Sequence, residues 1–360
     1  MNPISTVILG SGWRADQLAD ALSRHPDFVL RGFGARNTGA ASSLARKHAA
    51  TAAGDAATVL REVEPELVFV AVAPEASADL IALAVEHGAR VVVETPPASP
   101  ERLDGLAERY ADTVAVAEQY PRYPLHAARL ELIARGVIGM PTSASISSTQ
   151  LHHAAALLRL ALRVNPRTVR VRAREWTTSI VDVFGRQGWD DSLEPRERAR
   201  TVATIEFDDG LLGFYDFTAN QWNNRLIPAA MTVRGTHGEI RDDVVTRIVG
   251  PRTIVPSRIM RVRRGDEMDV FDGGTESLVF EGDVVARRPP HSTGQTDEAW
   301  ALSSFLDATA EWVRDGAAPP YPLTAAILDA RIGRAIVVSV EEDREVRLDL
   351  SLPRRRRRDR

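Results

Sequence analysis

A glycine turn between an apolar strand and an amphipathic helix, near the start of the chain, constrains the fold more than any other feature. The run "VILGSGWRADQLADAL" predicts a strand over Val7–Leu9, a tight turn over Gly10–Gly12 and a helix over Ala15–Leu22. A second strand is predicted over Phe28–Phe33. The small residues of G-x-G-x-x-A let the backbone approach a pyrophosphate, which also meets the free N–H groups of the helix N-terminus. The unit therefore predicts dinucleotide binding, with a purely structural turn as the alternative.

The alternation of strands and helices continues to about residue 118. Strands are predicted over Glu66–Ala73, Arg90–Val93 and Val114–Ala117, and a helix over Ala78–His87 ends at Gly88. This alternation is typical of a doubly wound parallel sheet, an α/β fold whose ligands bind beyond the carboxyl ends of the strands.

The end of the second strand bears on the choice of cofactor. NAD-binding sheets usually carry an acidic residue there, which accepts hydrogen bonds from the adenosine ribose. Here "RGFGARNTG" has no acid, and Arg36 and Asn37 follow the strand instead. Because an arginine can pair with a 2′-phosphate, we expect NADP, with NAD as the alternative if Arg36 is only a solvated loop residue.

Composition sets limits on the class of protein. The 360 residues carry a formal net charge of −4 and no cysteine, which gives no general attraction to nucleic acid and excludes disulfides and thiolate chemistry. No stretch reaches the length of a membrane span, and the chain starts directly with a strand-like run, so we expect a soluble, cytoplasmic protein without membrane or nucleic-acid partners.

Residues 352–360 contain the run "PRRRRRDR". We expect a disordered basic tail there, with a tether to nucleic acid or membrane as the alternative.

Several runs in order carry a resemblance to a known family. These are the glycine turn, "VAVAPEAS", "VVVETPP", "VAEQYPRYP" and "VRGTHGEI". With them the chain resembles the Gfo/Idh/MocA family of glucose-fructose oxidoreductase and inositol dehydrogenase. The resemblance implies a Rossmann domain, placed at residues 1–120, followed by an α/β domain with a large, mostly antiparallel sheet, placed at 121–351. It also implies a small-molecule substrate and a homodimer or homotetramer formed through that sheet.

The chain independently supports such a second domain. Two strands are predicted around the turn Asp208–Gly210, and further short strands follow in "MTVRGTHGEIRDDVVTRIV" and "GTESLVFEGDVVARR". An amphipathic helix in "TDEAWALSSFLDATAEWVRDG" is predicted to stop at Gly316, and "LTAAILDARIGRAIVVSVEED" predicts a last long helix.

The chain departs from the family at two polar positions. Relatives carry Glu-Lys-Pro where this chain has Glu94, Thr95 and a proline, and threonine cannot replace the charge of lysine. Relatives also carry Asp-x-x-x-His at the start of a helix. The register of "STQLHHAAALLR" places His153 at the histidine and Thr149 at the aspartate. His153 is therefore the expected proton donor or acceptor, with Tyr120 in reserve, although a satisfied core or helix-cap histidine is the alternative.

The expected site residues form three sets. The catalytic set is His153, Tyr120 and Thr95. The expected cofactor-binding residues are Gly10, Ser11, Gly12, Trp13, Arg14, Arg36, Asn37, Ala73, Pro74, Glu94 and Gln119. The expected substrate-binding residues are Arg122, Tyr123, Thr149, His152, Gln221, Trp222, Asn223 and Arg225. For Trp222 and Asn223 the alternatives are a core side chain and a turn. No metal-binding pattern is recognised, because adjacent histidines do not share a helix face.

These observations predict an oxidoreductase that moves a hydride between NADP and a small polar, sugar-derived, keto or imine substrate. Imine reduction is included because an imine is easily protonated and needs a lysine less. The alternative is a non-catalytic protein that binds a dinucleotide or metabolite at a degenerate site.

Overall fold

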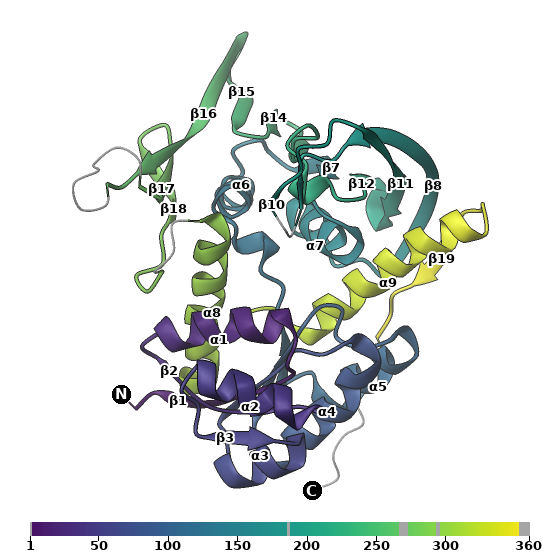
Figure 1. The fold of residues 1–360 in the computed structure, drawn as a ribbon. Coiled ribbons are helices and arrows are strands. Elements are labelled where there is room, and N and C mark those ends of the chain that lie inside the picture. Colours follow the sequence, from purple (N-terminus) through teal and green to yellow (C-terminus); the bar gives the residue numbers. More distant parts are fainter. Residues whose placement is uncertain (1, 186–187, 266–272, 293–295, 353–360) are drawn as a thin grey trace, which may run out of the picture.

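The computed structural model describes residues 2–185, 188–265, 273–292 and 296–352, which form two sheets covered by helices (Figure 1). Within these residues the first sheet has six parallel strands in the order β3-β2-β1-β4-β5-β6. Its strands are β1 Ile4–Leu9, β2 Phe28–Gly34, β3 Ala52–Gly54, β4 Leu67–Val70, β5 Arg90–Val93 and β6 Val114–Val116. The order reverses between β1 and β4, as in dinucleotide-binding sheets, and it confirms the predicted doubly wound parallel sheet.

Helices cover both faces of this sheet, and two of them come from the far end of the chain. The local helices are α1 Trp13–Arg24, α2 Thr38–Lys47, α3 Ala56–Val63, α4 Pro74–Glu86 and α5 Leu103–Tyr110, and the distant ones are α8 Asp297–Asp315 and α9 Leu323–Glu341. One face packs against α1, α2 and α8, where Phe305 and Trp312 are buried. The other face packs against α3, α4, α5 and the first turns of α9, where Leu323 is fully buried. The core of the first domain is therefore closed by residues beyond 296.

The second sheet is larger and almost entirely antiparallel. Its order is β18-β17-β16-β15-β14-β13-β7-β12-β11-β8-β19, and among the described strands only β7 and β12 are parallel neighbours. Its strands are β7 Pro141–Ser147, β8 Thr168–Val181, β11 Pro195–Phe207, β12 Leu212–Thr218, β13 Ala230–Gly235, β14 Gly238–Arg241, β15 Val244–Gly250, β16 Thr253–Arg263, β17 Thr275–Phe280, β18 Asp283–Arg287 and β19 Val346–Asp349. A small hairpin, β9 Phe184–Gly185 and β10 Gly188–Trp189, follows β8. The predicted mostly antiparallel second sheet is confirmed.

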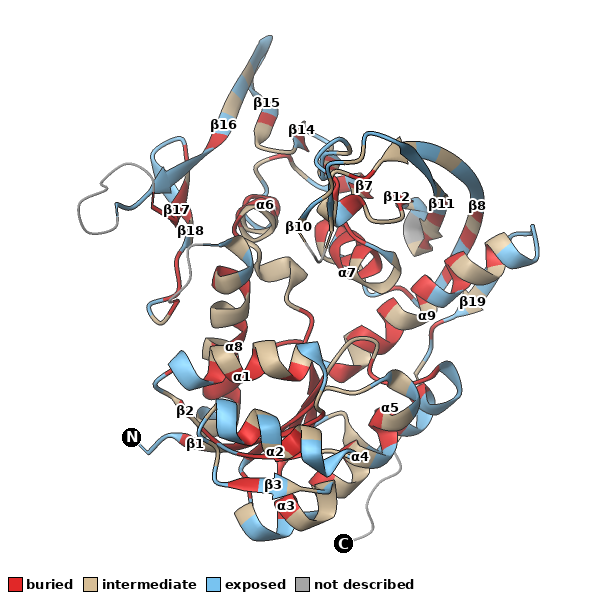
Figure 2. Cartoon of the chain, in the orientation of Figure 1, coloured by how far each residue is buried: buried red, intermediate tan, exposed pale blue. Residues whose placement is uncertain are grey.

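One face of the second sheet is covered and the other is open. Helices α6 Pro124–Ala134, α7 Leu151–Leu162 and much of α9 pack on one face, and Figure 2 shows the buried residues gathered between them and the sheet. A buried ion pair joins α7 to α9: Nε of Arg159 lies 2.6 Å from Oδ1 of Asp329, and the Tyr321 hydroxyl donates to the same carboxylate at 2.5 Å. On the opposite face, Trp176 and Phe214 are exposed.

Local signals explain most helix ends. The Thr296 hydroxyl caps α8 by accepting the Ala299 N–H at 3.1 Å, and α8 ends at Gly316, which adopts a φ of +67° as its predicted stop requires. Helix α4 begins at Pro74, four residues before its predicted start at Ala78, because proline suits the first turn, where its missing N–H costs nothing.

The described part of the chain ends at Leu352. Leu352, the first residue of the predicted basic tail, is half-buried against both cores, and residues 353–360 lie outside the described residues. Among the described helices, none is long and apolar enough to span a membrane.

Candidate active site

The carboxyl end of β6 and the start of α7 bring Glu118 and His153 together. Nδ1 of His153 lies 2.6 Å from Oε2 of Glu118, and the Tyr120 backbone N–H donates to the other carboxylate oxygen at 3.1 Å. Glu118 is only 2% exposed, and a buried carboxylate needs such partners because it has lost its hydration. The carboxylate holds Nδ1 of the ring, which leaves Nε2 as the nitrogen that can exchange a proton with a ligand.

Two rings pack against His153, and a third stacks on one of them. The Tyr120 ring centroid lies 4.5 Å from that of His153, Tyr123 stacks 5.4 Å from Tyr120, and His152 lies 4.2 Å from His153. Burial raises the pKa of Tyr120 and of Tyr123, so both phenols remain protonated near neutral pH. Burial, followed by the neighbouring His153, lowers the pKa of His152 to about 3, so this ring is neutral.

Thr149, at the position where an acid was expected, packs against Tyr120. It is 1% exposed, and its hydroxyl makes no hydrogen bond of normal geometry with the described residues. It nevertheless lies near enough to the Tyr120 hydroxyl to oppose the rise of that pKa. Behind this group, His152 lines an apolar cavity of about 410 Å³ between α7, α9 and the loop after β5. The carboxylate beside His153 is thus that of Glu118, which follows β6, whereas the loop before α7 carries the uncharged Thr149.

Arg14, in the first turn of α1, bridges the carboxyl ends of β5 and β6. Its Nε donates to Oε1 of Glu94 at 2.8 Å, and its Nη2 donates to Oε1 of Gln119 at 2.8 Å. Its Nη1 donates to Oε1 of Gln17 at 3.3 Å. Thr95, next to Glu94, is half-buried, and the peptide bond that follows it is cis. The glycine-turn helix and the "VVVETPP" strand are thus joined through one guanidinium.

The glycine turn leaves room for a dinucleotide. Gly10 has a φ of +144°, and a Cβ there would lie 2.2 Å from the Ala71 carbonyl oxygen, so only glycine allows the loops after β1 and β4 to approach. A Cβ on Gly12 would meet nothing within 4 Å, which leaves the N-terminus of α1 open. After β2, Arg36 is exposed, and Asn37 caps α2. The residues present therefore fit a dinucleotide laid across β1 and β4.

The other expected cofactor residues lie at the same edge of the sheet. Ser11 and Trp13 lie at the turn between β1 and α1, where Trp13 is 63% exposed. Ala73 and Pro74 begin α4 directly after the neighbouring strand β4. The structure thus gathers these residues, which lie far apart in the sequence, where the strand order reverses.

Two expected substrate residues are engaged elsewhere. The Arg122 guanidinium donates to the carbonyl oxygens of Ser304 and Pro320 at 3.1 and 3.0 Å, and so ties the segment after β6 to α8. Gln221 is buried, and its amide donates to the Ser147 carbonyl oxygen at 2.9 Å. These contacts position the loops around the site, and a role in binding substrate stays a prediction.

The rest of that loop is more accessible. Trp222 is 52% exposed and stacks on Phe217 at 5.0 Å, so it is not a core side chain. Asn223 donates to the Asn220 side chain at 3.0 Å within a short turn, and Arg225 is exposed. Their role as substrate residues likewise stays a prediction.

Sequence reasoning did not select Glu118. A signal was present, because Glu118 follows the buried run "VAVA" and the carboxyl ends of parallel strands carry the functional groups of such sheets. Among the described residues, no cluster of three histidine or acidic side chains could hold a metal ion.

Comparisons with known proteins bear on the fold and on the first part of the chain. Residues 4–118 match the family model described as GFO_IDH_MocA, an oxidoreductase family with an NAD-binding Rossmann fold. No curated protein matches the chain. Among solved structures, the chain is similar to myo-inositol dehydrogenase from Lactobacillus casei in complex with NAD(H) and myo-inositol, at 14% identity over 97% of this chain and 98% of that one, with a TM-score of 0.68.

Two further structures show the same fold. An oxidoreductase from Agrobacterium radiobacter in complex with NAD⁺, L-tartaric acid and magnesium is 13% identical over 97% of this chain and 99% of that one, with a TM-score of 0.69. A myo-inositol dehydrogenase from Corynebacterium glutamicum is 16% identical over 96% and 99%, with a TM-score of 0.65. At these identities the likeness shows the fold alone.

Proposed function

Because the chain belongs, through residues 4–118, to the Gfo/Idh/MocA family of NAD-binding oxidoreductases, we propose that it transfers a hydride between a nicotinamide dinucleotide and a small polar substrate. The observation that carries this proposal is the hydrogen bond from His153 to the buried Glu118, at the sheet edge on which the glycine turn opens. An oriented imidazole beside two protonated phenols can give or take the proton that accompanies hydride transfer.

The residues of the site divide the work. The turn Gly10–Gly12 and the N-terminus of α1 would hold the pyrophosphate, and the bound cofactor supplies or accepts the hydride. Glu118 fixes the ring of His153, and Tyr120 and Tyr123 limit water around it. His153 would then exchange a proton with the substrate oxygen or nitrogen through Nε2.

Replacement of His153 tests the function directly. Consumption of NADPH and NADH is followed with a panel of sugars, keto acids and imines, for the wild type and for His153→Asn. We expect the variant to bind cofactor normally and to lose about 10²–10⁴ of its rate, the range typical of a general acid or base. An unchanged rate would remove His153 from the mechanism, and an inert wild type that still binds NADPH would favour the non-catalytic alternative.

That alternative has one observation in its favour. Thr95 and Thr149 bring no charge to the site, and Thr149 is buried against Tyr120. A protein with this site would bind a dinucleotide or a metabolite without turning it over.

We propose NADP as the preferred cofactor. Arg36 is exposed just beyond the end of β2. No acidic residue lies between the end of β2 and Arg36. Arg36→Ala is expected to weaken NADPH binding by about tenfold or more while NADH binding changes little, since only NADPH has a 2′-phosphate to lose. Arg31→Ala, on the exposed side of β2, is the matched control, and equal losses for both cofactors would contradict the assignment.

The open face of the second sheet is the proposed oligomer surface. Trp176 and Phe214 are exposed on β8 and β12, the two strands on either side of β11, away from α7. A homodimer or homotetramer would cover them. Trp176→Glu is expected to give monomers by light scattering, and an unchanged mass would contradict this surface.

A further inference from the structure

We infer that Arg14 is the cation of the reaction centre, and that it holds the oxygen of a substrate carbonyl that has a carboxylate or hydroxyl next to it. This inference rests on the proposed function. It identifies the positively charged side chain that contacts the substrate, since Thr95 carries no charge.

The geometry of the clamp leaves part of the guanidinium available. The Arg14 side chain is 18% exposed, so it lies at the site wall and not in bulk solvent. Its bonds to Glu94, Gln119 and Gln17 occupy three of the five N–H donors of a guanidinium, within the described part of the chain. Two donors remain for a ligand, and two adjacent oxygen acceptors suit them.

Arg14 keeps its positive charge near neutral pH. Burial is the largest single influence and would lower the pKa of Arg14, but the Glu94 carboxylate, with smaller contributions from Glu298 and Tyr123, raises the pKa overall. Glu94 also fixes the direction of the guanidinium through Nε, at 2.8 Å. A cation held in place in this way costs little reorganisation when negative charge develops nearby, which is the condition for effective electrostatic stabilisation.

The segment after β6 places this cation and the proton donor at the same site. Gln119 accepts from Arg14, the preceding Glu118 holds His153, and the following Tyr120 packs on the His153 ring. The positive charge of Arg14 lowers the pKa of Tyr120 and of Tyr123, against the larger opposing effect of burial, so the guanidinium lies within electrostatic range of both phenols.

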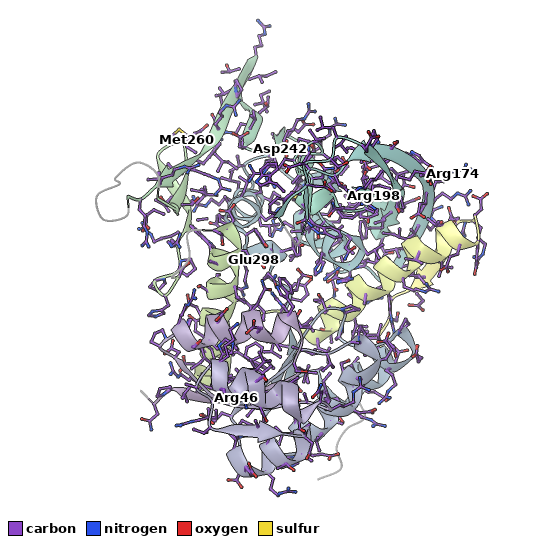
Figure 3. All side chains as sticks on the ribbon, viewed as in Figure 1. Arg46, Arg174, Arg198, Asp242, Met260 and Glu298 are labelled. Atoms are coloured by element: carbon purple, nitrogen blue, oxygen red, sulfur yellow. The ribbon has the colours of Figure 1, made fainter. Side chains whose placement is uncertain are left out.

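A second carboxylate lies within electrostatic range of Arg14. Glu298, which Figure 3 labels at the end of α8 nearest the second domain, interacts electrostatically with Arg14 and raises the pKa of Tyr120. The carboxylates of Glu94 and Glu298 lie near the guanidinium without cancelling its free donors. An acceptor on the substrate would bind at the two remaining donors of Arg14, on the part of the guanidinium that Glu94 does not contact.

The reaction step is balanced with these groups. During reduction the carbonyl carbon would gain the hydride that a bound reduced nicotinamide supplies, and the nicotinamide would be the group oxidised. The C=O π bond breaks, the oxygen takes up the electron pair beside Arg14, and the proton held by His153 passes to that oxygen to give an alcohol. Oxidation of the alcohol runs through the same groups in reverse.

Binding of oxamate, an unreactive analogue of a 2-oxo acid, tests the inference without turnover. Calorimetric titrations in the presence of NADPH compare the wild type with Arg14→Met, Arg14→Lys and the double variant Arg14→Met/Thr95→Lys. We expect Arg14→Met to lose about 100-fold in oxamate affinity, Arg14→Lys to retain part of it, and the lysine at 95 to restore part of the loss. NADPH affinity is measured in parallel by quenching of tryptophan fluorescence. Because Arg14 is also an expected cofactor-binding residue, a loss of NADPH affinity as large as the loss for oxamate would assign Arg14 to the cofactor and overturn the inference.

Controls separate this role from a structural one. Arg102→Met removes an exposed arginine that pairs with Asp79 at 2.6 Å, and should bind oxamate like the wild type. Glu94→Gln keeps the shape of the clamp and should lower affinity only a fewfold. If circular dichroism shows that Arg14→Met is misfolded, the oxamate affinities of Arg14→Lys and Glu94→Gln test the inference in its place. Oxamate binding that is absent in the wild type, or equal in the wild type and the Arg14 variants, would overturn the inference. The His153→Asn variant distinguishes this inference from the proposed function, because it should lose turnover and still bind oxamate.

Discussion

Acid should destabilise this protein through His152, whose ring is held between His153 and the apolar cavity behind α7. Its Nε2 is buried and has no hydrogen-bond partner among the described residues. Burial is the main cause that lowers its pKa to about 3, with His153 second. In an unfolded chain the same ring has a pKa of about 6.5.

The sign and size of the effect follow from these two values. Above about pH 6.5 His152 is neutral in both states, and its contribution to stability is fully present. Below that pH the unfolded chain binds a proton that the folded protein does not bind until about pH 3. The free energy of unfolding therefore falls by about 1.4 kcal/mol per pH unit in this window, which amounts to about 2 kcal/mol at about pH 5.

Urea unfolding of the wild type, His152→Asn and the exposed control His87→Asn measures this contribution. Between neutral pH and about pH 5 the wild type and His87→Asn should each lose about 2 kcal/mol more than His152→Asn. Histidine ring NMR, assigned with the same variants, gives the pKa itself. Parallel losses in all three proteins, or a His152 resonance that titrates near its unfolded value, would refute the reasoning.

Three further perturbations test the site and its support. Arg159→Met leaves the buried Asp329 carboxylate without its cation, and should cost about 3–5 kcal/mol in urea unfolding, with less than additive loss when Asp329→Leu is added. Glu118→Gln keeps the shape beside His153 but removes the charge, and should lower the rate about 10–100-fold with an unchanged circular dichroism spectrum; a normal rate would contradict the role of the carboxylate. Gly10→Ala should destabilise the fold because its Cβ meets the Ala71 carbonyl oxygen, whereas Gly12→Ala should fold normally and bind NADPH at least tenfold more weakly, as measured by thermal melting and by fluorescence titration.

Local patterns were sufficient to predict five of the six described strands of the first sheet, and the short strand β3 Ala52–Gly54 was not predicted. The strand Arg90–Val93 and the glycine turn were read at their observed positions, because a continuous apolar run and a G-x-G turn are encoded by neighbouring residues. The early start of α4 at Pro74 was missed because the preceding apolar residues were assigned to the strand.

The polar contacts of the site depend on residues distant in sequence, and periodicity does not report such pairs. Glu118 meets His153 across 35 positions, and Arg14 meets Gln119 across 105. Arg122 was expected to face the substrate, yet its guanidinium binds carbonyl oxygens about 180–200 positions later. Sequence placed most of these residues near the right sheet edge but did not show which partner each one would find.

The packing of α8 on the first sheet has a consequence for synthesis of the protein. Phe305 and Trp312 fill one face of a sheet whose last strand ends at Val116, so about 190 residues must be translated before that face can close. At ordinary rates of translation this takes roughly 10–40 s, during which the nascent sheet exposes an apolar surface. The dinucleotide-binding half is therefore first to leave the ribosome yet among the last parts to finish folding, and a chain that stops before Trp312 would be a substrate for chaperones and proteases.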